Sequence, residues 1–201
     1  MSDWRTLTPP APTRLPEARP AALYGLGLLY AVVSVVTGSL VFSYFHLAAN
    51  AEDWPHGGAP PPGVGSYALS VLLSALAAAA ATYAHRDAVR HDDHRRSAMA
   101  LAACATAAVG SLVVLGLHLA DLPFAVDDHA YGAIVTTLVG TVVLVFAGGT
   151  IGALVVMAWV LLGHAETGTA DARRIVRAYW ISAVVLAVVV FAVLLGGARM
   201  L

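Results

Sequence analysis

The stretch AYGAIVTTLVGTVVLVFAGGTIGALVVMAWVLLG, Ala130–Gly163, decides the fold of this chain. It contains no Lys, Arg, Asp or Glu, and it is longer than the ~20 residues that a helix needs to cross ~30 Å of hydrocarbon. Four further stretches share this character, at Ala21–Ala48, Val64–Ala84, Ala98–Leu119 and Ala178–Ala198. The sequence therefore predicts an all-α integral membrane protein with five transmembrane helices.

Charge alternates in sign between these five spans. Every basic residue is an arginine, and ten of the eleven precede span one or lie between spans two and three or four and five. They are Arg5, Arg14, Arg19, Arg86, Arg90, Arg95, Arg96, Arg173, Arg174 and Arg177. The other two connections carry only acids, namely Glu52 and Asp53, then Asp121, Asp127 and Asp128. Because arginine-rich loops stay in the cytoplasm, the pattern predicts a cytoplasmic N-terminus and an external C-terminus; only Arg199 departs from it.

Composition limits the class of protein. The chain is 59% hydrophobic and 11% charged, and its mean hydropathy is +0.78, which excludes a soluble or a disordered protein. Its net charge of −1 argues against nucleic-acid binding. We expect two regions, a Pro-rich cytoplasmic tail at 1–20 and a five-helix transmembrane domain at 21–201.

Few side chains offer chemistry. No ionisable group lies near the middle of a span, which disfavours a pump, a channel or a stand-alone transporter. The sequence contains no nucleophile–base pair and no phosphate-binding loop, so we predict no catalytic, cofactor-binding or metal-ligating residue. His91-Asp92-Asp93-His94 is interpreted as the solvated polarity of an arginine-rich loop rather than as a metal site.

Histidines at the ends of the spans leave one redox alternative open. His46 and His118 lie near the predicted external ends of spans one and three, and His85 and His164 near the cytoplasmic ends of spans two and four. Two such pairs are what a diheme b-type cytochrome would use for bis-imidazole ligation. Histidines tolerated at the membrane interface are the simpler interpretation.

Span four carries a face of small residues, Gly140, Gly148, Gly149 and Gly152, which includes the four-residue spacing from Gly148 to Gly152. Small residues let helix backbones approach closely in lipid, where hydrophobic association is absent. We therefore predict a tight helix crossing at this face.

Several different short motifs lie at the ends of the predicted helices. Tyr24-Gly25 opens span one, Tyr44-Phe45-His46 closes it, and Trp54-Pro55 follows. Thr82-Tyr83-Ala84-His85 closes span two. Span four is preceded by Asp121-Leu122-Pro123-Phe124 and opens with Tyr131-Gly132, and the matching pattern extends to Gly140. Span five opens with Tyr179-Trp180. In order, spacing and placement, this set resembles subunit III of the haem–copper terminal oxidases, in the short five-helix form of many prokaryotic enzymes.

The resemblance implies a non-catalytic accessory subunit in a prokaryotic cytoplasmic membrane. In that family the complex reduces O2 to water and pumps protons, while haem and copper belong to subunits I and II. The resemblance thus implies no cofactor in this chain, subunits I and II as partners, and bound phospholipid. Trp54, Tyr131, Tyr179 and Trp180 are expected to be packing and interface anchors. The subunit III-like protein that accompanies nitric-oxide reductases fits the same motifs and stays open as an alternative.

The chain departs from the family pattern at four places. The segment Thr141–Phe146 is apolar where the family often has Gly-x-His-Gly-x-His, and Ile181 and Ser182 replace the His and Asp that usually follow Tyr-Trp. No carboxylate occurs around Val33-Ser34, and His118 stands where an acid is common. The chain is thus a divergent member, and roles in proton uptake or oxygen entry that depend on those residues do not transfer to it.

Overall fold

A computed structural model describes residues 19–52, 54, 63–90, 94–122, 124, 126, 128–162 and 169–200. In this part of the chain the helices are α1 (Arg19–Asn50), α2 (Val64–Arg90), α3 (His94–Ala120), α4 (Ala130–Leu161) and α5 (Thr169–Met200). All five are long and apolar enough to cross a membrane, as predicted for an all-α membrane protein. Of the predicted tail at 1–20, only its last two residues are described, in the first turn of α1.

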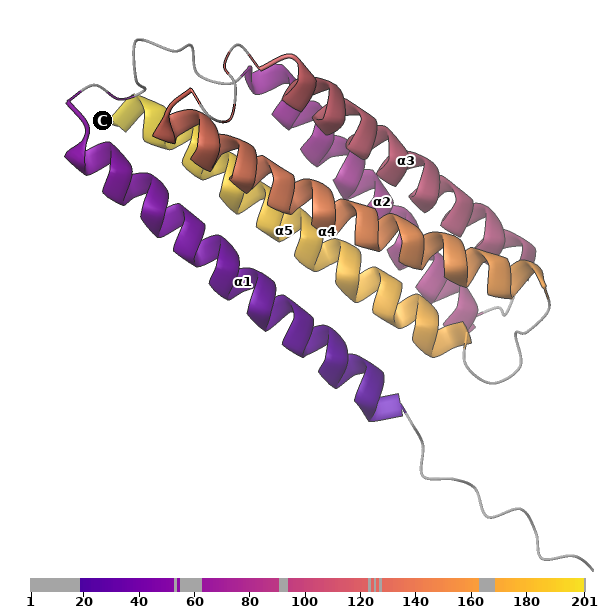
Figure 1. The fold of residues 1–201 in the computed structure, drawn as a ribbon. Coiled ribbons are helices and arrows are strands. Elements are labelled where there is room, and N and C mark those ends of the chain that lie inside the picture. The colour runs from indigo at the N-terminus through magenta and orange to yellow at the C-terminus, as the bar shows by residue number, and fades with distance from the viewer. Residues whose placement is uncertain are drawn as a thin grey trace, which may run out of the picture.

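Four of the helices form a closed ring, and α1 lies outside it (Figure 1). Around the ring α2 packs against α3, α3 against α4, α4 against α5, and α5 against α2. Helix α1 runs along α4 and α5 and makes the smallest interfaces of the bundle. The first span is therefore the one that the rest of the protein holds least firmly.

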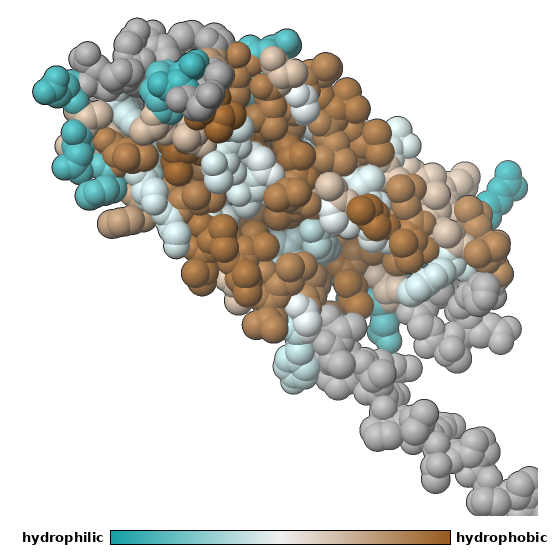
Figure 2. All heavy atoms as spheres, viewed as in Figure 1, coloured by the Kyte–Doolittle hydropathy of each residue, from teal (hydrophilic) through white to brown (hydrophobic). Residues whose placement is uncertain are grey.

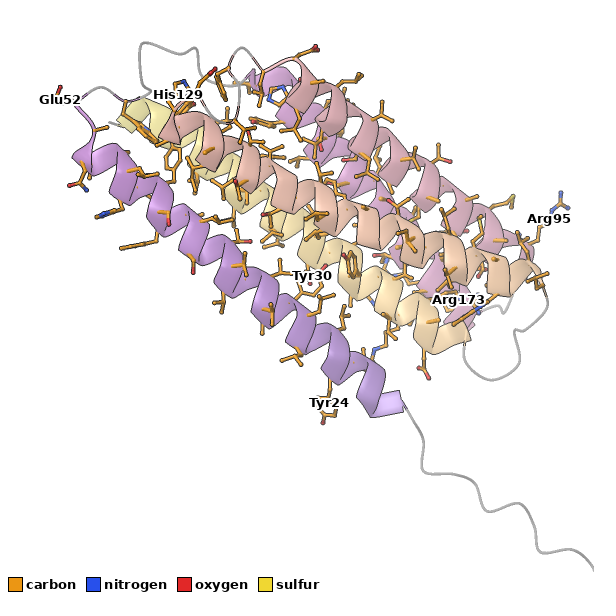
Figure 3. All side chains as sticks on the ribbon, in the orientation of Figure 1. Tyr24, Tyr30, Glu52, Arg95, His129 and Arg173 are labelled. Carbon is orange, nitrogen blue, oxygen red and sulfur yellow. The ribbon has the colours of Figure 1, made fainter. Side chains whose placement is uncertain are left out.

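Charged side chains gather at the two ends of the bundle, on either side of an apolar middle (Figures 2 and 3). Because consecutive helices run in opposite directions, the α2–α3 and α4–α5 connections lie at the same end as the start of α1. This basic end carries Arg19, at the start of α1, and seven further described arginines, Arg86, Arg90, Arg95, Arg96, Arg173, Arg174 and Arg177. The opposite, acidic end carries Glu52, Asp121 and Asp128.

Three helices extend by about a turn or more beyond the apolar stretches that predict them. Helix α2 continues to Arg90, α3 begins at His94, and α5 begins at Thr169. The prediction that the arginines at 86–96 and 173–177 lie in connecting loops is therefore wrong, because all seven are helical. Apolarity marks only the part of a helix that crosses hydrocarbon, and Ala and Arg favour helix beyond that limit.

Small side chains fill the α2–α3 interface. Ala77, Ala81, Cys104 and Ala108 are buried there, which lets the two backbones approach closely. Polar contact adds to this packing: the Ser111 Oγ donates to the Ser70 carbonyl over 2.9 Å, and the two hydroxyls lie 2.8 Å apart. The Ser70 and Ser111 hydroxyls are thus paired between helices rather than left facing lipid.

Large apolar side chains cover the outside of the bundle. Each helix contributes exposed examples, among them Phe42, Leu72, Val113, Leu144 and Val185. On a soluble protein such a surface would aggregate, but facing lipid tails it is the expected exterior of a membrane-spanning bundle.

Candidate functional site

Tyr179 and Trp180, the pair that opens span five, join three helices. The Tyr179 hydroxyl donates to the Val145 carbonyl of α4 over 2.7 Å, and the Tyr30 hydroxyl of α1 donates to the Tyr179 carbonyl over 2.6 Å. The Tyr30 and Tyr179 rings meet edge to face with centroids 5.4 Å apart. Trp180 is fully buried, and its ring centroid lies 5.7 Å from that of Phe146. The pair is therefore a packing centre between α1, α4 and α5.

Two neighbouring glycines of α4 make room for these rings. A Cβ atom on Gly149 would lie 2.7 Å from Tyr179 Cε1 and 3.0 Å from Trp180 Cζ2, and one on Gly148 would lie 2.8 Å from Tyr179 Oη. Cβ atoms on Gly140 and Gly152 would meet no described atom within 4 Å. The predicted tight crossing is therefore correct at Gly148 and Gly149, and wrong at Gly140 and Gly152. The adjacent glycines Gly148 and Gly149 accommodate the rings of Tyr179 and Trp180, whereas the glycine four residues after Gly148, Gly152, does not contribute.

A second set of motif residues meets at the acidic end. The ring centroid of Trp54 lies 5.3 Å from that of Tyr44 and 5.0 Å from that of Tyr131, and Phe124 lies 5.6 Å from Tyr131. Tyr44 also abuts α5, because a Cβ atom on Gly197 would lie 2.6 Å from its Cε1. Aromatic residues from both connections at the acidic end thus close this end of the bundle over α1, α4 and α5.

His129 fixes the start of α4 beside this cluster. Its Nδ1 accepts a hydrogen bond from the Gly132 backbone N–H over 3.0 Å, and its own backbone is extended, as expected at an N-cap. His129 is not among the residues predicted from the sequence, since histidine is not a favoured N-cap residue. Its position just before a long apolar run was the available signal.

The remaining motif residues do not converge on these clusters. Tyr24 is 76% exposed, and a Cβ atom on Gly25 would meet no described atom within 4 Å. His85 is half-buried on α2, and Asp121 is exposed after α3. Pro55 and Pro123 lie outside the described residues.

The histidines of the cytochrome alternative occupy different surroundings. His46 is exposed on α1 and stacks on Phe42, with ring centroids 6.0 Å apart. The ring centroid of His118 on α3 lies 4.6 Å from that of Tyr67 on α2. Helix α1 packs mainly on α4 and α5, so its histidine does not face that of α3. His164 lies outside the described residues. Among the described residues, no three His, Cys, Asp or Glu side chains are grouped so that they could hold a metal ion.

Arg173 is a buried charge that sequence reasoning missed (Figure 3). It is 3% exposed, and its Nη1 donates to Ser97 Oγ of α3 over 2.6 Å. The Ser97 hydroxyl in turn donates to the Ala84 carbonyl of α2 over 3.4 Å, so the chain of contacts joins α5, α3 and α2. Helical periodicity could have found it, because Arg173 continues the buried stripe of Val176 and Trp180 by one more turn.

A groove runs between α1 and α5 on the outside of the bundle. It has a volume of about 460 Å³ and is lined mainly by apolar residues, together with Tyr30, Ser34, Thr37 and Ser182. A smaller hollow of about 320 Å³ continues it on α5 toward the basic end, lined by Arg174 and Arg177 among others. We call these the α1–α5 groove and the arginine hollow.

No known family model matches this chain, and a search of curated proteins finds no relative.

The hydroxyl of Tyr67 allows a first test of the packing. It is buried and lacks a hydrogen-bond partner among the described residues, while the ring lies 4.4 Å from that of Phe191. Removing an unpaired buried hydroxyl costs nothing, so Tyr67→Phe should leave the unfolding free energy unchanged or raise it by up to about 1 kcal/mol. Thermal unfolding in detergent measures this.

Tyr30→Phe is the matched control, because its hydroxyl donates to the Tyr179 carbonyl. It should lower the unfolding free energy by about 1 kcal/mol. If Tyr67→Phe proved the more damaging of the two, the Tyr67 hydroxyl would have to be satisfied by ordered water.

Proposed function

We propose that this chain is a non-catalytic accessory subunit of a respiratory haem–copper terminal oxidase, similar to subunit III. The complex would reduce O2 to water and pump protons. Haem and copper would be bound by subunits I and II, and this chain would stabilise subunit I and support assembly of the complex.

The observation that carries the proposal is the convergence of the family-like motifs in space. Trp54 and Phe124, which come from two separate connections, meet Tyr131 of α4 in one aromatic cluster. Tyr179 and Trp180 meet the glycines of α4 in another. Residues that match the family by their order in the sequence thus act together as packing centres, which supports a shared bundle shape rather than a shared catalytic site.

Charge supports a definite orientation in the membrane. Eight described arginines, Arg19 among them, belong to the basic end, whereas Glu52, Asp121 and Asp128 belong to the acidic end. By the positive-inside rule we place the basic end, with the start of α1, in the cytoplasm and the C-terminal end of α5 outside. The membrane would be the cytoplasmic membrane of a prokaryote.

The apolar exterior suits a subunit embedded beside another. Exposed residues such as Leu144 and Ile151 on α4 offer a surface that can face either lipid or a neighbouring helix. Neither the exterior nor the bundle contains a continuous ionisable path among the described residues, in keeping with a supporting role. Phospholipid would fill the outer grooves that a partner leaves open.

Co-purification tests the proposal. The tagged full chain is extracted from native membranes in a mild detergent, and its partners are identified by mass spectrometry together with haem absorption and O2 consumption. We expect subunits I and II of a haem–copper oxidase in stoichiometric amounts, and O2 uptake by the complex. Recovery of the chain without such subunits would refute the proposal.

The alternatives give different results in the same experiment. Nitric-oxide reductase subunits in place of oxidase subunits would identify the related accessory protein. A Soret band carried by the isolated chain, and lost in His46→Ala or His118→Ala, would instead identify a diheme cytochrome. His129→Ala serves as the control for these two changes, since His129 caps α4 and belongs to neither predicted pair.

A further inference from the structure

The two halves of α1 are held unequally by the rest of the bundle. We call the half before Gly38 the basic half and the half after it the acidic half, because they lie toward those ends. In the acidic half the buried Tyr44 ring abuts Gly197 of α5 and lies 5.3 Å, between ring centroids, from Trp54. In the basic half none of the side chains at 23–29 is buried, and none packs against the hydrophobic core. The acidic half is therefore anchored, whereas the first turns of the basic half are not.

One tyrosine fastens the basic half. Tyr24 is directed away from the other helices, whereas Tyr30 lies between α1 and α5 (Figure 3). The Tyr30 hydroxyl donates to the Tyr179 carbonyl over 2.6 Å, and among the described side chains this is the one hydrogen bond between α1 and another helix. The two rings also meet edge to face. Hydrogen bonds between transmembrane helices are individually weak, so a contact of this kind, which we call the latch, can open and close.

The sequence Gly38-Ser39 joins the two halves, and it is a weak point of the helix. Sharp bends of helices concentrate at Gly/Ser pairs. The Ser39 hydroxyl donates to the Val35 carbonyl and the Ser43 hydroxyl to the Ser39 carbonyl, each over 2.9 Å. Hydroxyls that bond back to the preceding turn in this way loosen a helix and bend it. A Cβ atom on Gly38 would meet no described atom within 4 Å, so packing does not demand glycine there. The weak point thus lies between the anchored half and the loosely held half.

We propose that the basic half of α1 is a hinged strap, which pivots at Gly38-Ser39 and is closed by the Tyr30 latch. The strap gates the α1–α5 groove, because four of the five residues that line the groove from α1 belong to the strap or its hinge, namely Tyr30, Ser34, Thr37 and Gly38. The Thr37 hydroxyl has no hydrogen-bond partner among the described residues in the closed position, so opening the strap breaks no bond there. Opening widens the groove sideways into the membrane, while the acidic half stays in place.

Distances between spin labels on α1 and α3 test the movement. The full chain, with Cys104→Ala to remove its own thiol, carries pairs of introduced cysteines and is placed in bilayer nanodiscs for double electron–electron resonance. One pair, Tyr24→Cys/Met99→Cys, reports on the basic side, and the other, Ala49→Cys/Leu117→Cys, on the acidic side; all four positions are exposed. We expect two distances for the basic-side pair, one for the closed and one for the open strap, and a single distance for the acidic-side pair.

Two variants move the balance between the closed and the open strap in opposite directions. Tyr30→Phe keeps the ring and removes the hydrogen bond, so it should raise the ratio of open to closed about fivefold. Its control, Tyr67→Phe, removes a buried hydroxyl from the acidic end of α2 and should leave the ratio unchanged. Gly38→Ala strengthens the helix at the hinge and should lower the ratio about threefold. Gly27→Ala is its control, because Gly27 is equally open but lies away from the hinge.

Three results would overturn the proposal. Basic-side distances that stay native in Tyr30→Phe and also in Tyr30→Ala, which removes the ring as well and should raise the ratio about thirtyfold, would show that Tyr30 does not close the strap. Longer distances in both pairs would mean that α1 moves as a rigid rod. Equal effects of Gly38→Ala and Gly27→Ala would remove the hinge. Because the measurement is made on this chain alone, none of these outcomes depends on whether an oxidase partner is found.

Discussion

Replacing Arg173 with alanine should lower the free energy of unfolding by about 3 kcal/mol, because it removes a buried charged hydrogen bond and the packing of a long side chain. Arg173 is 3% exposed and donates to Ser97 over 2.6 Å. Through the Ser97 hydroxyl it also connects α5 to the Ala84 carbonyl of α2. The change should therefore loosen three helices at the basic end. Unfolding of the purified chain by increasing fractions of sodium dodecyl sulfate in mild detergent, followed by circular dichroism, measures it.

Arg174→Ala is the matched control for this change. It removes the same side chain one residue further along the same helix, where the arginine is exposed and forms no hydrogen bond or ion pair with another described residue. It should change stability by less than about 0.5 kcal/mol in lipid-free detergent. Two variants of equal stability would contradict a structural role for Arg173. Ser97→Ala should reproduce part of the loss, since it removes the group that joins Arg173 to α2.

The number and the position of the spans could be predicted because they depend on a local and additive property. Transfer of each side chain into hydrocarbon contributes separately, so a window of apolar residues such as Ala130–Gly163 identifies a span without knowledge of its neighbours. The ends could not be predicted in the same way. Helix α2 continues to Arg90, and α5 already begins at Thr169. The residues in these extensions are polar, so hydropathy does not mark them, and helix propensity determines where the helices end.

Contacts between the spans could not be predicted from the sequence, for a different reason. Trp54 and Tyr131 could each be predicted as anchors from their place at a helix end, but nothing in a sequence states that they meet. The same limit explains Arg173, whose burial depends on which face α5 turns toward α2 and α3. Hydropathy indicates that a segment enters the membrane, but it does not determine how the helix is rotated about its own axis. Rotation is set by packing against the other helices.

Gly149 shows this limit most directly, and it gives the second large expected effect. Gly149→Ala should lower the unfolding free energy by about 2–3 kcal/mol, because its new methyl group would overlap rings that cannot easily move. The added carbon would lie 2.7 Å from Tyr179 Cε1 and 3.0 Å from Trp180 Cζ2, and Trp180 is fully buried. The spacing of glycines along α4 predicted a crossing, but it could not distinguish this position from its neighbours.

Gly152→Ala is the control, and its expected effect has the opposite sign. A Cβ atom there meets no described atom within 4 Å, so the change keeps only the gain in helix propensity, up to about 1 kcal/mol. A double-mutant cycle then assigns the cause: in a Tyr179→Ala background, Gly149→Ala should cost less than in the native chain, because one of the two obstructing rings is gone. The same detergent unfolding measurement serves all four variants. Equal behaviour of Gly149→Ala and Gly152→Ala would mean that α4 and α5 do not approach through the Gly148–Gly149 pair, and the packing centre built on Tyr179 and Trp180 would have to be abandoned.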